Sequence, residues 1–218
     1  MFDAFIKVGG SLFDKSELQA SAARWSMLAA QHRLLLLPGG GPFADQVRTA
    51  DTRFNLSDSA AHWMAILSMD QYAYLLADLA PNAVLVRDLT TAAATCTAGH
   101  LAILAPSTLL LQLDPMPHSW QVTSDSIAAW LAAYAHIQLL ILLKSVAGAS
   151  PISLRENSGA LIPRVPVQSL PGYNLVDPYF AQTLSAKTTC WILDGRRPER
   201  LAELLSHGST VGTRIVGA

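Results

Sequence analysis

Two glycine-rich turns, each directly after a short apolar run, are the chemically suggestive features of this sequence. The first run ends in Lys7-Val8-Gly9-Gly10-Ser11, and the second ends in Pro38-Gly39-Gly40-Gly41. Glycines let backbone N–H groups approach an anion closely, and the N-terminus of a following helix adds a favourable dipole. Because a single helix-sized stretch separates the turns, we expect them to meet in one site. Such a site would bring two phosphate-bearing groups together, as phosphoryl transfer requires.

Two lysines lie at the ends of apolar runs. Lys7 could neutralise the charge that spreads over a phosphoryl group in transit, although a lysine there could also simply reach water. Lys144 follows the most hydrophobic run of the chain and begins the turn Lys144-Ser145-Val146-Ala147-Gly148-Ala149. This turn suits the phosphates of a nucleotide, and we expect Gly212, in the Gly208–Thr213 tail, at the same edge of the fold.

A carboxylate at a predicted helix start is the third chemical group. Thr123-Ser124-Asp125 precedes an apolar helical pattern. Asp125 either caps that helix or orients Lys7 and a neighbouring lysine or Mg²⁺; the spacing alone allows both.

Candidate acceptor-binding residues follow the second glycine turn. Asp45 and Arg48 belong to the next short helix, and His62 belongs to the long helix after it, where a histidine is more often structural. No metal-ligand spacing relates the histidines His100, His118, His136 and His207 to one another, and the chain has no HExxH or CxxC motif;. We therefore predict no metal held by side chains. The Walker spacing is also missing, so a kinase of this sequence would not be a P-loop kinase.

Composition limits the class of protein. The 218 residues are 51% hydrophobic and only 14% charged, which favours a sheet buried on both faces;. A net charge of −1 provides no basic field, so neither nucleic acid nor a membrane is an expected partner;. Cys96 and Cys190 resemble small buried hydrophobes of a reducing compartment, and we expect a cytoplasmic protein. The uncharged stretch 89–113 contains Gly99 and Pro106, and predicts two buried strands instead of a membrane span;.

Alternating strand and helix patterns predict an α/β fold with a largely parallel sheet between helical layers. Strands are expected at 2–8, 33–37, 83–86, 101–104, 137–143, 189–193 and in the closing 208–216 segment. Helices are expected at 12–32, 43–51, 56–80, 124–135, 177–187 and 197–205, with loops and a hairpin over 150–172. The 56–80 helix has too many apolar residues for one buried stripe, which indicates a homo-oligomer.

In this order, the motifs resemble those of the amino acid kinase family. Lys7–Ser11 resembles the family's opening K-x-G-G-S, and Pro38–Gly41 its second glycine turn. Ser124–Ala132 resembles its N/S-D-x-x-A-A-x-x-A helix start, Leu142–Gly148 its nucleotide loop, and Gly208–Ile215 its closing G-x-x-x-G-T-x-I. The resemblance runs almost from end to end of the chain.

This resemblance implies a three-layer α/β/α sandwich formed by one domain, 1–218. The acceptor would bind to about residues 1–116, and ATP with Mg²⁺ to about 117–218. Lys7 would stabilise the transferred phosphoryl group, and Asp125 would organise the catalytic lysines. Backbone N–H groups of Gly9, Gly10, Gly40 and Gly41 would bind phosphate oxygens.

Within the family, Ala61–Ile66, Met69–Gln71 and Val176–Phe180 look most like a small subgroup of methanofuran-type cofactor biosynthesis. Its members convert an aminomethylfuran-methyl phosphate to the diphosphate. For such a small-molecule phosphate acceptor, the candidates to hold the phosphate are Arg48, Arg53 and His62. Those to hold the amine are Asp45 and Asp58.

The chain also departs from the family pattern. The nucleotide loop carries Ser145 and Ala147 where relatives have aspartates. Many relatives also have a second catalytic lysine at the start of a late helix, but here that region is 174–179 and no lysine follows until Lys187. Lys144 could supply the missing charge. A non-catalytic nucleotide- or oxyanion-binding storage or regulatory protein is therefore an alternative to an ATP-dependent kinase. A kinase of a carboxylate is a third possibility.

Overall fold

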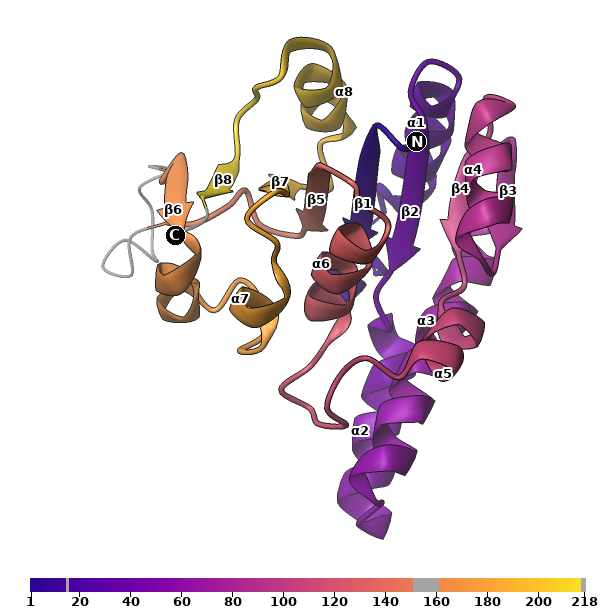
Figure 1. Cartoon of the computed structure of the whole chain (residues 1–218), viewed down its shortest axis with the longest axis vertical. Coiled ribbons are helices and arrows are strands. Elements are labelled where there is room, and N and C mark those ends of the chain that lie inside the picture. Colours follow the sequence, from indigo (N-terminus) through magenta and orange to yellow (C-terminus); the bar gives the residue numbers. More distant parts are fainter. Residues whose placement is uncertain (15, 151–160, 217–218) are drawn as a thin grey trace.

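A single eight-stranded sheet passes through the molecule in the order β3-β4-β2-β1-β5-β7-β8-β6 (Figure 1). The computed structural model describes residues 1–14, 16–150 and 161–216. The strands are β1 (Ala4–Val8), β2 (Leu34–Pro38), β3 (Ala83–Val86), β4 (Leu101–Leu104), β5 (Leu139–Lys144), β6 (Arg164–Pro166), β7 (Thr189–Asp194) and β8 (Thr213–Val216). All neighbouring strands are parallel except β7 and β8, which are antiparallel.

Helices cover both faces of the sheet, which confirms the predicted mostly parallel α/β sandwich. They are α1 (Leu18–Ala29), α2 (Gly41–Phe54), α3 (Asp58–Leu79), α4 (Leu89–Thr97), α5 (Ser107–Leu113), α6 (Ser124–Tyr134), α7 (Phe180–Thr183) and α8 (Pro198–His207). The described residues also include the 3₁₀ helices η1 (Gly10–Leu12) and η3 (Val167–Tyr173). One apolar core contains residues from α4, α6 and α7, and the other contains residues from α1, α3 and α8.

The alternation of side chains along β1 decides on which face of the sheet each side chain lies. Ile6 and Val8 pack in the core with α1, whereas Phe5 packs in the core with α6. Because successive side chains of a strand point to opposite faces, Lys7 lies on the α6 side with Phe5. Lys7 is paired in register with Leu142 of β5, so Lys144, two residues further along β5, faces the same side;.

Two predicted segments are wrong. In the 89–113 stretch, the strand expected at 101–104 is confirmed as β4, but the residues on either side of it form α4 and α5 instead of a second strand. Asp88 caps α4 by accepting a hydrogen bond from the Thr91 N–H at 2.7 Å;. The predicted 177–187 helix is reduced to α7, because Asp177 binds the start of α6 and Leu184 is extended. In the predicted 150–172 loop-and-hairpin region, β6 pairs in parallel with β8, and residues 151–160 lie outside the described residues.

The long α3 begins where the sequence indicates, since the Ser57 hydroxyl accepts the Ala60 N–H at 3.2 Å;. It packs along α2, and the two helices extend together beyond the carboxyl end of β2 (Figure 1). None of the described helices is both long enough and apolar enough to cross a membrane.

Candidate active site

One carboxylate joins the two predicted lysines. Asp125 lies in the first turn of α6, which packs over β1 and β5 (Figure 1). Its Oδ1 is 2.9 Å from Nζ of Lys7, and its Oδ2 accepts a hydrogen bond from Nζ of Lys144 at 2.6 Å. The side chains of Lys7 and Asp125 are only 4% and 6% exposed, and that of Lys144 is 14% exposed. Two ammonium groups are thus held side by side at the ends of adjacent strands.

Burial and charge act on this cluster in opposite directions. Burial lowers the pKa of Lys7 to about 8, because the charged form loses its hydration, although Asp125 partly offsets this;. Burial alone would raise the pKa of Asp125, but the ammonium groups of Lys144 and Lys7 outweigh it and lower that pKa to about 2;. Asp125 is therefore ionised at neutral pH and balances one of the two positive charges.

Asp177 holds the start of α6 in place, a role that the sequence did not indicate. Its Oδ2 accepts hydrogen bonds from the Thr123 N–H at 3.1 Å, the Thr123 hydroxyl at 2.7 Å and the Ser126 N–H at 3.0 Å. Its Oδ1 accepts from the Ser126 hydroxyl and from the Tyr179 N–H. The side chain of Thr123, the residue before the helix, makes no cap of its own. A distant carboxylate therefore caps the helix that carries Asp125.

The two glycine turns touch each other, as the sequence predicts. A Cβ atom at Gly10 would lie 2.8 Å from both the nitrogen and the Cα of Gly41, so a side chain there would displace backbone. Gly41 itself has a φ of +54°, a conformation that favours glycine;. Gly10 begins η1 and Gly41 begins α2, and helices leave their first N–H groups without intrahelical partners;. These N–H groups are suited to binding an anion.

One detail of the predicted phosphate contacts is wrong. The Gly9 N–H does not point to a ligand, because it donates to the carbonyl oxygen of Leu143 at 2.8 Å. A side chain at Gly9 would also lie 2.7 Å from that oxygen, so the glycine is required for close approach of β1 to β5. The N–H of Gly39 is likewise used, since it donates to the Val8 carbonyl at 2.8 Å.

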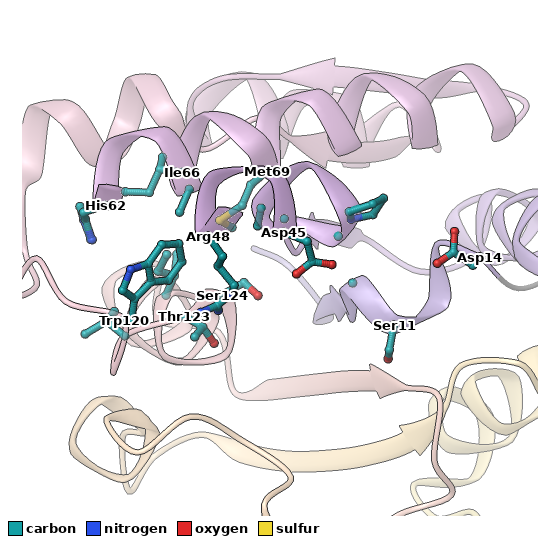
Figure 2. Close-up of a pocket in the computed structure, with 18 residues that line it drawn as sticks. Ser11, Asp14, Asp45, Arg48, His62, Ile66, Met69, Trp120, Thr123 and Ser124 are labelled. Atoms are coloured by element: carbon teal, nitrogen blue, oxygen red, sulfur yellow. The ribbon is translucent and has the colours of Figure 1, made fainter. Parts of the chain in front are cut away.

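A pocket of about 380 Å³ lies between α2, α3 and the start of α6. Figure 2 shows Ser11 and Asp14 at one end and His62 and Trp120 at the other. Between them, the charged lining is formed by Asp45 and Arg48. The remaining lining residues include Gly10, Gly40, Gly41, Ile66, Met69, Val122, Thr123, Ser124 and Ile127. This volume and mixture of apolar and charged groups suit a small polar metabolite.

Trp120 gives the far end of this pocket its shape, although the sequence did not single it out. The guanidinium carbon of Arg48 lies 4.1 Å from the centre of the Trp120 ring, within the range of a cation–π interaction;. The indole Nε1 donates to Asp51 at 2.7 Å, which fixes the ring. Arg53 and Asp58, two of the predicted acceptor candidates, do not line the pocket.

A second pocket, of about 490 Å³, meets the first at Ser11. Lys144, Ser145, Val146 and Gly148 line it, together with Ser150, Tyr173, Asn174 and Leu175. Ser11 belongs to the lining of both pockets. Ligands in the two pockets would therefore approach each other at Ser11, close to Lys144 in the second pocket. The two sequence motifs suggest such a meeting point but do not establish it.

Thr213, at the start of β8, packs against the loop that lines the second pocket. The Thr213 hydroxyl accepts the Ala149 N–H at 2.8 Å, and a Cβ atom at Gly148 would clash with that hydroxyl oxygen. Gly212 is buried against Ile192 and Leu193. Lys7, Gly9, Gly39, Ala149 and Gly212 line neither pocket directly. Apart from the Gly9 N–H contact with phosphate, which is wrong, their predicted roles in catalysis or ligand binding stay predictions.

Comparison with known proteins gives consistent results at the level of family and fold. The model of the amino acid kinase family matches residues 4–171. The chain is 29% identical to the (5-(aminomethyl)furan-3-yl)methyl phosphate kinase of Methanocaldococcus jannaschii over 214 residues, 97% of each chain.

Solved structures support the fold alone, because their sequence identities are low. Uridylate kinase from Archaeoglobus fulgidus has a TM-score of 0.75 at 20% identity, with 99% of this chain and 100% of that chain covered. UMP kinase from Ureaplasma parvum has a TM-score of 0.71 at 12% identity, with 98% of each chain covered. An isopentenyl phosphate kinase substrate complex has a TM-score of 0.62 at 17% identity, with 97% and 99% covered.

Proposed function

The chain belongs to the amino acid kinase family, and from this premise we propose that it is an ATP-dependent kinase of a small phosphate monoester. The observation that carries the proposal is the meeting of two pockets at Ser11, next to the Lys7–Asp125–Lys144 cluster. One pocket would hold the acceptor and the other the nucleotide. As a working division, residues 1–116 form most of the acceptor half and 117–218 most of the nucleotide half. The acceptor pocket also takes Trp120 and the start of α6 from beyond this boundary.

The reaction forms a bond between an acceptor oxygen and the transferred phosphorus and breaks the bond from that phosphorus to ADP. Negative charge on the equatorial oxygens must be stabilised during this step. The ammonium groups of Lys7 and Lys144 lie where they could do so, and Asp125 fixes their spacing. Lys144 thus takes the place of the late lysine found in many relatives. The N–H groups of Gly10 and Gly41 would orient the phosphates that meet at the two glycine turns.

The second pocket fits ATP better than it fits a protein-held metal ion. Its described lining offers a lysine, hydroxyl groups and backbone, but no carboxylate, and Asp125 is already paired with two lysines. Mg²⁺ prefers oxygen ligands and commonly keeps several waters. We therefore infer that Mg²⁺ accompanies ATP through phosphate oxygens and water. This arrangement accounts for Ser145 and Ala147 at the family's aspartate positions.

For the acceptor, we favour an aminomethylfuran-methyl phosphate. Ile66, Met69 and Trp120 offer an apolar wall for a flat ring, and Asp45 could bind an ammonium group. Arg48 could contact the phosphate, as the sequence suggests, whereas His62, also a candidate from the sequence, lies at the end of the pocket away from Ser11. The similarity to the archaeal (5-(aminomethyl)furan-3-yl)methyl phosphate kinase supports this choice.

The direct test is to incubate the purified protein with Mg-ATP and separate phosphate monoesters. The panel includes (5-(aminomethyl)furan-3-yl)methyl phosphate, UMP and isopentenyl phosphate, and products are identified by mass and by ³¹P NMR. We expect ADP and the diphosphate of the aminomethylfuran. Transfer to another monoester alone would refute the acceptor but support the kinase. ATP binding without transfer to any acceptor would favour the non-catalytic alternative that Ser145 and Ala147 suggest.

We also propose that α3 contributes to a homo-oligomer interface. Met64, Leu67 and Tyr74 are 39%, 49% and 56% exposed on this helix, whereas Ile66, Met69, Tyr72 and Leu76 of the same helix are buried in the protein. Sedimentation at micromolar concentration is expected to detect an oligomer. Sedimentation as a monomer would refute the interface without affecting the proposed reaction.

A further inference from the structure

His62, Asp114 and His118 form a cluster at the end of the acceptor pocket, separate from the lysine–aspartate site. One ring nitrogen of each histidine and one carboxylate oxygen of Asp114 all lie within 4.8 Å of one another. His62 comes from α3, Asp114 follows the last residue of α5, and His118 lies in the segment before α6. Three parts of the chain thus bring potential metal ligands to one point, which the spacing of the histidines did not indicate.

The His118 ring is held in the orientation that a metal ligand needs. Its Nδ1 lies 2.7 Å from the Ser59 hydroxyl, and its Nε2 lies 2.9 Å from Oδ1 of Asp114. Metal-binding histidines usually form a hydrogen bond through the second ring nitrogen, which sets the tautomer and the ring orientation. If Nδ1–H donates to Ser59, the lone pair of Nε2 points toward Asp114.

His62 is the third potential ligand of the cluster. Its ring stacks on that of His118, with centroids 4.4 Å apart and planes 17° apart. The stacking brings one nitrogen of each ring to within 4.8 Å of the other and of one Asp114 carboxylate oxygen.

We propose that His62, Asp114 and His118 bind one divalent cation of the zinc class at the end of the acceptor pocket. Two imidazoles and one carboxylate suit Zn²⁺ or Co²⁺, whereas Mg²⁺ and Ca²⁺ prefer sites made of oxygen ligands. Three protein ligands leave one coordination position open. Because His62 lines the pocket opposite Ser11 (Figure 2), that position would face the end of the acceptor away from the transferred phosphoryl group. An amine, a carboxylate or water could occupy it.

The site is tested by titrating tag-free, metal-depleted protein with ZnCl₂ alone in a calorimeter. Visible absorption of the Co²⁺-substituted protein reports the coordination geometry. We expect one equivalent of Zn²⁺ to bind, because the three side chains would hold a single ion. The Co²⁺ protein should show the intense bands of a four-coordinate site. Neither readout requires kinase activity, so the proposed reaction can fail while the metal site stands.

Variants then assign the ligands. His118→Ala and Asp114→Asn should each lower Zn²⁺ affinity at least ~10-fold, and Ser59→Ala should lower it about 10-fold although it leaves every ligand in place. His100→Ala, at an exposed histidine before β4, is the matched control and should bind Zn²⁺ normally. Circular dichroism shows which variants are folded, and Asp114→Asn changes an exposed residue if His118→Ala does not fold. Failure to bind stoichiometric Zn²⁺, or binding that survives both Asp114→Asn and Ser59→Ala, would overturn the proposal.

Discussion

The ammonium nitrogen of Lys144 lies 2.6 Å from Oδ2 of Asp125, although one residue ends a strand and the other begins a helix. Because Lys7 lies 2.9 Å from the other oxygen of the same carboxylate, the three groups form one buried electrostatic unit. Removing any member leaves the other two with an uncompensated charge or an incomplete set of hydrogen bonds. This unit is the origin of the predictions for Lys144, Asp125 and Lys7.

Lys144→Ala should lower kcat by about 10²- to 10³-fold, as expected for loss of a cation that stabilises transition-state charge. The exposed Lys187→Ala is the matched control and should retain full activity. Release of ADP in the presence of the acceptor measures both. Unchanged kcat in Lys144→Ala would exclude Lys144 as the substitute for the late family lysine.

Asp125→Asn should destabilise the fold, because it leaves two buried ammonium groups without a counter-ion. The expected loss is about 3–5 kcal/mol in the free energy of unfolding, measured by urea denaturation. Asp78→Asn, at an exposed position of α3, should change stability by no more than about 0.5 kcal/mol;. Equal stability of the two variants would mean that the Asp125 ion pairs contribute little to the folded state.

The pH dependence should follow Lys7. Its pKa is lowered from 10.5 to about 8 in the folded protein, so Lys7 loses its proton, and its catalytic charge, as pH rises through 8. Plots of kcat/KM against pH should therefore fall above pH 8. The fall in kcat should come at higher pH, since bound phosphates favour the charged lysine. A flat kcat/KM profile above pH 8 would contradict a role for protonated Lys7.

The contribution of Lys7 to the free energy of unfolding should rise as Lys7 loses its proton, whereas kcat/KM falls over the same pH range. Between pH 8 and 10.5 the unfolded chain binds more protons at Lys7 than the folded protein does. By linkage, the contribution of Lys7 to the free energy of unfolding rises with pH in this window. A fall in the contribution of Lys7 to the free energy of unfolding between pH 8 and 10.5 would argue against the lowered pKa.

Asp177→Asn should impair catalysis through α6. The amide retains the size of the side chain but accepts fewer hydrogen bonds than the carboxylate that binds Thr123 and Ser126;. A small displacement of Asp125 should lower kcat by about 10- to 100-fold, while the KM for ATP changes little. Asp177→Glu should recover part of kcat. A loss of activity that merely follows the unfolded fraction would show a structural role only.

Gly10→Ala should separate the two glycine turns. Its new methyl group would lie 2.8 Å from the backbone of Gly41, and we expect a loss of about 1–3 kcal/mol in stability and a higher KM for the acceptor;. Gly172→Ala is the control, because no atom of the described residues lies within 4 Å of a Cβ atom there. Equal KM values for the two variants would mean that the contact of the turns is not needed for acceptor binding.

Much of the fold could be predicted because its signals are local. The apolar runs of β1 and β5, the glycine turns after β1 and β2, and the cap at Ser57 depend on neighbouring residues only. The same local logic failed over 89–113, because a buried helix and a buried strand share an apolar composition. There the capping of α4 by Asp88 favours a helix over a strand. The spacing from Asp88 to Thr91 that allows this cap is present in the sequence.

The least predictable parts of the site are contacts between distant segments. The sequence shows Asp177 only as the start of a predicted helix, yet its carboxylate caps α6. Arg48 and Trp120, or His62 and His118, likewise come together from separate elements. No periodicity or motif relates such pairs, because their distance depends on how the helices pack.

The sequence by itself determined the order of strands and helices, the glycine turns and the presence of lysines at strand ends, since backbone preferences and hydrophobic periodicity act over a few residues. Only the tertiary structure decided that one carboxylate joins Lys7 and Lys144, and that two pockets meet at Ser11. It also decided that the Gly9 N–H binds Leu143 instead of a ligand. The physical reason is that charge pairing, burial and pocket shape depend on the parallel alignment of β1 with β5 and on the position of α6 above them.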